Sequence, residues 1–239
     1  MTAQRTSWSL SQMPVLLRGD PELLGAWVQR WQTGRVVLYV AVICVGAGLF
    51  GAAMGVWRSP LQAAYGAIKF PLIFLLTGFG NALLNGMLAP LLGLNLRFRE
   101  SLLAILASFT IAAAILGAFS PLVSFLIWNT PPLSETTTGS SAAYSLVKLV
   151  PVAMIAFAGV AANVQLVRLL RRLAGDATIA NRILSAWLAV NLLLGSQLSW
   201  MLRPFIGSPD LPVEFLRATA FRGNFFENVF RSLYLLFSQ

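Results

Sequence analysis

The chain has 239 residues, of which 57% are hydrophobic and 10% are charged, and its mean hydropathy is +0.75. Soluble domains carry about 25% charged residues, so the composition excludes an ordinary soluble protein and predicts an all-α, polytopic transmembrane helical bundle. The net charge is +9, but no run of basic residues is longer than two. We therefore attribute the positive charge to cytoplasmic loops that contact anionic lipid headgroups, and we expect no nucleic-acid partner.

Several kinds of chemistry are missing from the sequence. It contains no histidine and a single cysteine, Cys44, which excludes imidazole-held metals or pigments, a Ser-His triad and an intrachain disulfide. We find no HExxH, GxSxG or Walker sequence, and no paired carboxylates within the apolar stretches. We therefore predict a protein that is not an enzyme and has no catalytic residue, metal site or identifiable cofactor. Bound lipids are the small molecules that we expect.

Residues 1–34 form an amphipathic segment on the cytoplasmic side or at the membrane interface. Its charges and lack of a continuous apolar core argue against a cleavable signal peptide. Gly19-Asp20-Pro21 divides the segment, and Asp20 is predicted to cap a second helix with Pro21 at its first position. The tryptophans fit a membrane interface, but an ordinary helix packed on the end of the bundle is an equal alternative.

Residues 35–202 contain five predicted membrane spans. About 20 residues rising ~1.5 Å each cross ~30 Å of hydrocarbon. In the first span, Gly51 and Gly55 form a GxxxG pair that predicts close helix packing, although glycine is also simply common in membrane helices. The second is too long for one straight crossing, and Pro71 and Pro90 predict a kink or an interfacial extension. The spans are residues 36–57, 63–92, 101–128, 144–170 and 183–202.

Two segments outside the spans are predicted to be polar or interfacial. Residues 129–141 form a loop without Arg or Lys. Residues 203–239 form an interfacial tail with a short amphipathic helix. In this tail Arg203 is a predicted interfacial anchor, which pairs with Glu214, binds lipid phosphate or simply ends a helix at the interface.

The distribution of arginine orients the spans. With a cytoplasmic N-terminus, the short outer loops hold only Arg58, besides Lys69 and Lys148 at helix starts. We therefore predict a bacterial cytoplasmic (inner) membrane protein whose N-terminus is cytoplasmic. Arginines in the tail leave two alternatives open: the tail lies on the outer leaflet, or one span is a re-entrant pair. The inner segments hold ten arginines: Arg5, Arg18, Arg30, Arg35, Arg97, Arg99, Arg168, Arg171, Arg172 and Arg182.

A short pattern, AAYxxxK, occurs at residues 63–69 and again at 142–148, and each copy precedes a proline. It indicates either a tandem pair of helical hairpins or chance in an alanine-rich chain. Lysine is costly in lipid, so we expect Lys69 and Lys148 to act as anchors that reach the outer interface, with a tyrosine beside each.

Uncharged polar side chains within the spans are the candidate site residues. Asn81 and Asn85 are four residues apart and share a helix face. The set fits a polar pathway, or hydrogen bonds between helices worth about 0.6–2 kcal/mol each, and we favour the second interpretation. No Asp or Glu lies mid-span, so we expect no proton relay. The amide candidates are Asn81, Asn85, Asn163, Gln165, Asn191 and Gln197, and hydroxyl groups accompany them at Thr77, Ser196 and Ser199.

Three motifs carry a resemblance to a known family. Lys69-Phe70-Pro71-Leu72 opens a span, Trp200-Met201-Leu202-Arg203-Pro204-Phe205-Ile206-Gly207 closes the last one, and Gly223-Asn224-Phe225 follows. Over about residues 60–230 the chain resembles uncharacterised bacterial multipass proteins that are similar in plan to the Yip-type membrane family. Eukaryotic members of that family interact with small GTPases in vesicle traffic. The resemblance implies an integral membrane adaptor without an active site, and it does not imply a GTPase partner here.

Two functions fit the sequence. The first is a non-enzymatic structural or accessory subunit, or scaffold, of a larger membrane assembly, with lipids and other membrane proteins as partners. The alternative is a small transporter or channel lined by the intramembrane Asn and Gln side chains.

Overall fold

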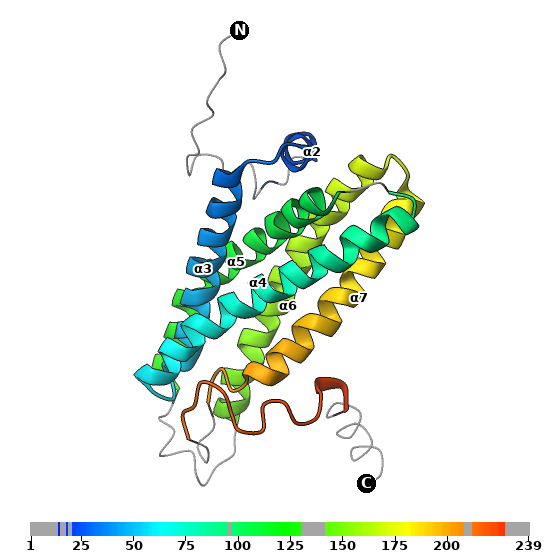
Figure 1. Ribbon diagram of the computed structural model, residues 1–239. Coiled ribbons are helices and arrows are strands. Elements are labelled where there is room, and N and C mark those ends of the chain that lie inside the picture. The colour runs from blue at the N-terminus through cyan, green and yellow to red at the C-terminus, as the bar shows by residue number, and fades with distance from the viewer. Residues whose placement is uncertain are drawn as a thin grey trace.

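The computed structural model describes residues 21–94, 97–130, 142–207 and 212–227, together with Pro14 and Arg18. Within these residues the chain forms helices and no strand, which confirms the all-α class. Five helices are long and apolar enough to cross a membrane, so the chain is a multipass integral membrane protein, as predicted. The helices are α2 (Pro21–Gln29), α3 (Thr33–Gly55), α4 (Pro60–Leu91), α5 (Phe98–Trp128), α6 (Ala142–Ala174) and α7 (Ala177–Leu202) (Figure 1).

Helices α4 and α7 begin before the predicted starts at residues 63 and 183, and a side chain caps the first turn of each helix. The Ser59 hydroxyl accepts a hydrogen bond from the backbone N–H of Gln62, and Pro60 takes the first helical position. At α7 the Asp176 carboxylate accepts from the N–H groups of Thr178 (2.6 Å) and Ile179 (3.3 Å). These two bonds hold the pKa of Asp176 below its usual value.

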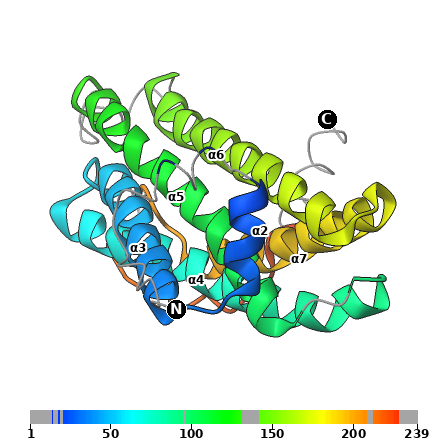
Figure 2. The ribbon, with the colours of Figure 1, turned by 90° about the horizontal axis from the view of Figure 1, so that it is seen from above.

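The spans run in alternate directions, and four of them form a ring (Figure 1). Helix α4 packs on α5 and α7, and α6 packs on the same two helices. Helix α3 lies outside the ring against α4 and α5. At one end, α2 lies across α5 and α6 (Figure 2), and at the other end lies the C-terminal segment, residues 203–207 and 212–227. We call these two ends the α2 end and the tail end.

Helix α4 has 32 residues and is one continuous helix through Pro71. At ~1.5 Å per residue it is about 48 Å long, so it exceeds the ~30 Å of hydrocarbon and crosses the bundle obliquely (Figure 1). The helix also continues through Pro90 to Leu91, and the predicted interfacial extension stays a prediction.

Backbone contact holds α3 against α4. A Cβ atom added at Gly51 would lie 2.3 Å from the carbonyl oxygen of Gly66, and one at Gly55 would lie 2.5 Å from that of Gln62. Both positions therefore need glycine, because any side chain would occupy the space of the neighbouring backbone. The structure thus places the GxxxG pair of the first span in the tightest part of this interface.

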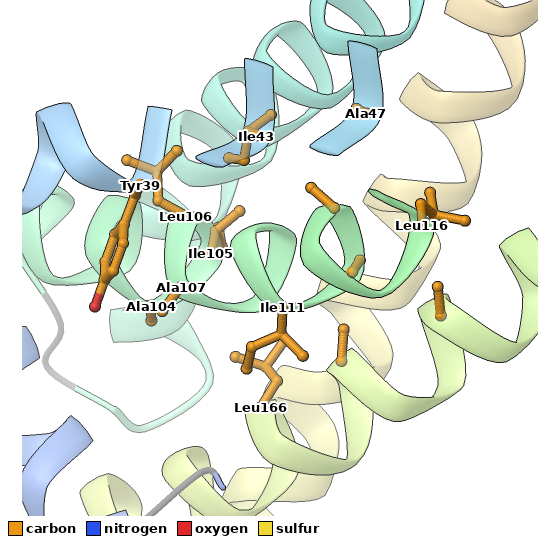
Figure 3. Packing of buried hydrophobic residues seen from close by; sticks show 14 of the residues in the cluster. Tyr39, Ile43, Ala47, Ala104, Ile105, Leu106, Ala107, Ile111, Leu116 and Leu166 are labelled. Carbon is orange, nitrogen blue, oxygen red and sulfur yellow. The ribbon is translucent and has the colours of Figure 1, made fainter. Parts of the chain in front are cut away.

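Helix α5 is the central helix of the bundle. Buried residues make up 61% of its most apolar stretch, the largest share among the five spans. Against α3, a Cβ added at Gly46 would lie 2.2 Å from the carbonyl oxygen of Ala113. Around this contact the side chains of α3, α5 and α6 interdigitate (Figure 3). The buried ones include Tyr39, Ile43, Ala47, Ile105, Leu106, Ile111, Leu116 and Leu166.

We expect Gly51→Ala to destabilise the bundle by about 1–3 kcal/mol or more, because the added methyl group collides with backbone that cannot rotate away. The matched control is Gly159→Ala in α6, where an added Cβ meets nothing within 4 Å. Thermal unfolding in detergent micelles would measure both variants. A Gly51→Ala protein as stable as the wild type would contradict the close packing of α3 on α4.

Candidate functional site

A cluster of amide side chains joins α4 to α7. The Asn85 Nδ2 group donates to Asn81 Oδ1, one helical turn away. The Asn81 Nδ2 group donates to Asn191 Oδ1 and to the backbone oxygen of Trp187, 3.3 Å away. Asn81 and Asn85 are fully buried. Three of the six predicted amides therefore meet in one place, and each interhelical bond of this kind is worth about 0.6–2 kcal/mol in a membrane.

The side-chain hydrogen bonds in this cluster all have the same direction, because Asn85 donates to Asn81 and Asn81 donates to Asn191. Its oxygen accepts from Asn81, whereas its own NH2 group donates to no group among the described residues. Asn191 lines a cavity of about 580 Å³ inside the four-helix ring. The cluster therefore ends in a hydrogen-bond donor at the cavity wall.

The cavity has mostly apolar walls with a few polar positions. Its volume lies within the ~300–1,000 Å³ that is typical of small-molecule sites. Among the described residues, no charged side chain lines it. The lining residues are Ile73, Phe74, Thr77, Ser108, Phe109, Ala112, Leu116, Ile155, Ala158, Gly159, Ala162, Asn163, Leu188, Asn191, Leu192, Gly195, Ser196 and Ser199.

Thr77 differs from the other polar groups of this wall. Asn163 donates to the Gly159 carbonyl 2.8 Å away in its own helix, and Ser196 donates likewise to Leu192. Thr77 is only 4% exposed, and its hydroxyl has no hydrogen-bond partner in the described part of the chain. A buried hydroxyl without a partner costs about 1–3 kcal/mol, so its presence in the wall needs an explanation.

A second cavity of about 510 Å³ adjoins the first towards the tail end. The two share Ile73, Phe74, Ile155 and Ser199 in their walls. The C-terminal segment covers the second cavity with its residues 204–207. The hollow in the ring therefore extends from mid-span to the underside of this segment.

Lys69 and Gln62 of α4 fasten the C-terminal segment. The Lys69 Nζ atom lies 3.2 Å from the carbonyl oxygen of Pro204 and 3.4 Å from that of Glu214. Gln62 Nε2 donates to Pro204 (2.9 Å) and Phe205 (3.1 Å). The two side chains are seven residues apart on one face of α4, and both hold the same turn of backbone.

The side chain of Lys69 is fully buried under the C-terminal segment, and its predicted role as an interfacial anchor stays a prediction. Carbonyl dipoles replace its water, and the faces of two aromatic rings add to them, with Nζ 5.8 Å from the Tyr65 centroid and 5.4 Å from that of Phe215. The tyrosine expected beside Lys69 is present, whereas sequence reasoning missed the two carbonyls and Phe215, because these partners lie more than 130 residues further along the chain. The side chain of Lys148, the other predicted anchor, lies outside the described residues.

The remaining candidates lie apart from the cluster. Gln197 Oε1 accepts from the N–H of Phe225 in the C-terminal segment, 3.3 Å away, and Gln165 Nε2 donates to the Arg18 carbonyl at the α2 end, also 3.3 Å away. Asn163 lines the cavity but bonds within its own helix. The six amides thus do not form one continuous row.

Arg203 lies at the end of α7, with its guanidinium carbon 3.1 Å from the centre of the Trp200 ring. Burial lowers the pKa of Arg203, and the positive charge of Arg217 lowers it further. Within the described residues Arg203 and Glu214 form no ion pair, and the one pair found joins Arg172 to Glu22 at 3.1 Å. The predicted role of Arg203 as an interfacial anchor stays a prediction.

Comparisons of the chain with protein-family models, with curated proteins and with solved structures find no match. The resemblance to the Yip-type family stays a prediction from its three motifs.

We expect Lys69→Met to loosen the C-terminal segment, because the Glu214 carbonyl loses its donor and the Pro204 carbonyl keeps only the bond from Gln62. Cleavage of this segment by proteinase K should become about five- to tenfold faster, as a loss of about 1–1.4 kcal/mol of local stability implies. The matched control is Arg222→Met, whose side chain is exposed in the same segment. Equal cleavage rates in Lys69→Met and wild type would show that Lys69 does not hold the segment.

Proposed function

We propose that this integral membrane protein takes up an amphiphilic, lipid-like molecule between α4, α5, α6 and α7 and catalyses no reaction on it. The cavity of about 580 Å³ carries this proposal, because its walls are apolar and its few polar groups are uncharged. Such walls suit a guest that already resides in the bilayer.

The cavity is partly open to the outside of the bundle, and its walls would lose favourable contacts in a membrane if it stayed empty. Atoms that line a void lose their dispersion contacts, and an apolar cavity of about 150 Å³ already binds small apolar molecules. Some lining residues remain accessible, among them Ile155 of α6 (37%) and Leu192 of α7 (62%). We propose that the guest enters from the side, between these helices, and that bound lipid is its natural source.

The absence of a reaction is supported by the chemistry of the wall. The polar lining groups are hydroxyls and amides, which bind and orient but do not exchange protons near neutral pH. Within the described residues, no acid or base accompanies them in either cavity.

We expect Gly159→Phe to exclude the guest, because a side chain at this position extends into open space in the cavity wall. Val160→Phe is the matched control, since Val160 is 65% exposed and does not line the cavity. Native mass spectrometry of gently purified protein should find a bound lipid-like molecule in wild type and Val160→Phe, and much less in Gly159→Phe. Equal amounts in all three proteins would refute binding in this cavity.

A second candidate function, an accessory subunit or scaffold of a larger assembly, is favoured by α7. This helix is the least apolar of the five spans, and only 17% of its most apolar stretch is buried by the rest of the chain. A helix of this kind gains from a neighbouring membrane protein, which offers small-residue packing and hydrogen bonds that lipid lacks. The adaptor role implied by the family resemblance agrees with it.

We further propose the bacterial cytoplasmic membrane as its location, with the α2 end in the cytoplasm. The arginines of the described residues support this orientation, because the α2 end carries Arg30, Arg97, Arg99, Arg168, Arg171, Arg172 and Arg182, and the tail end carries Arg58, Arg203, Arg217 and Arg222.

A photo-cross-linking residue at position 193 of α7 should capture another membrane protein in cells. The same residue at position 83 of α4 is the matched control, because Leu193 and Leu83 are similarly exposed, at 58% and 48%. Capture of lipid alone at both positions would contradict the accessory role and leave the proposal of a bound guest intact.

A further inference from the structure

We infer that the guest is a neutral lipid whose hydroxyl or carbonyl group is held at mid-membrane by Thr77 and Asn191. This inference rests on the proposed uptake of a guest and adds its chemical class. It follows from the hydrogen-bonding groups of the wall, their depth and the lack of charge around them.

Thr77 and Asn191 lie on the faces of α4 and α7 that contact each other, within one helical turn of the same level. Asn81 and Thr77 are one turn apart on α4, and Asn191 and Gly195 are one turn apart on α7. Asn81 bonds to Asn191, and a Cβ added at Gly195 would lie 3.8 Å from the Thr77 hydroxyl. The Thr77 hydroxyl itself has almost no accessible surface, and because residue 195 has no side chain, only the backbone of Gly195 faces it at this level of α7.

The two groups offer complementary hydrogen bonds to a guest. The Asn191 NH2 group donates, since its oxygen is already occupied by Asn81. The Thr77 hydroxyl both donates and accepts, and it is a buried group with no partner in the described part of the chain. A carbonyl oxygen of the guest accepts from both groups, and a hydroxyl can also donate to Thr77.

The absence of charge excludes an ionic headgroup at this place. Among the described residues, neither cavity has a charged side chain in its wall. The buried ammonium of Lys69 is taken up by the carbonyls of Pro204 and Glu214. A phosphate or ammonium group here would be desolvated without a counter-charge, at a cost of several kcal/mol.

The depth of Thr77 and Asn191 in the membrane also favours a neutral guest. Thr77 and Asn191 lie near the middle of their helices, α4 and α7, so they are about 15 Å from either edge of the hydrocarbon. A glycerophospholipid keeps its headgroup at the interface and presents only its acyl chains at this depth. The hydrogen-bonding groups therefore fit a long apolar molecule with an isolated hydroxyl or carbonyl group.

The test compares hexadecanol, 2-hexadecanone and hexadecane in equilibrium binding to the full-length protein in detergent. Wild type should bind the alcohol and the ketone about fivefold more tightly than the alkane, as one or two bonds in an apolar site imply. Thr77→Val should reduce this preference to about one- to twofold without weakening alkane binding. Thr77→Ser, which keeps the hydroxyl, should retain it.

Thr110→Val is the matched control, because Thr110 is equally buried but donates to Leu106 of its own helix and does not line the cavity. Gly195→Ala is a second, independent variant, which places a methyl group 3.8 Å from the Thr77 hydroxyl, between α4 and α7, and should also lower the preference.

The possible outcomes separate this inference from the proposal on which it rests. Equal binding of alcohol and alkane to wild type, an unchanged preference in Thr77→Val, or stronger competition by phosphatidylglycerol than by hexadecanol would overturn the neutral-lipid assignment. The proposed function survives each of these if Gly159→Phe still abolishes binding. Failure of all probes to bind wild type would overturn both.

Discussion

The absence of water from the bilayer interior is the constraint on which this structure depends. A polar group there must find its partner within the protein, at a cost of several kcal/mol if it does not. Only 10% of the residues are charged, and the chain meets this rule in part, because buried atoms such as Asn85 Oδ1, Ser101 Oγ and Trp187 Nε1 have no partner in the described part of the chain. Asn81 is satisfied by Asn191 across the α4–α7 interface, and Lys69 is satisfied by backbone carbonyls of the C-terminal segment. These bonds fix the register of α4 against α7 and close the tail end of the bundle.

The rest of the architecture follows from close packing on one side of the bundle and looser packing on the other. Glycines 46, 51 and 55 bring α3 into backbone contact with α4 and α5. Helices α6 and α7 are much less covered, with 28% and 17% of their apolar stretches buried. The cavity lies between the tightly and the loosely packed helices, and the Thr77 hydroxyl in its wall is a buried group without a partner among the described residues. The guest that we propose would supply the missing bond to Thr77.

Much of the fold could be predicted from local patterns, whereas the site could not. Apolar length gave the five spans, and the break at Pro21 marked the start of α2, because both signals act within one helix. The shared face of Asn81 and Asn85 was equally visible. Their partner on α7, the burial of Lys69 and the role of Gln62 depend on residues more than 100 positions away, and helix periodicity does not encode which helices become neighbours.

The most direct measurement is an electron-density map from crystals of the full-length protein grown in lipid. The account predicts α4, α5, α6 and α7 in a ring, with elongated non-protein density between them that ends within hydrogen-bonding distance of Thr77 and Asn191. A ring collapsed so that α4 meets α6 with no space between them, or a hollow filled only by ordered water, would contradict it.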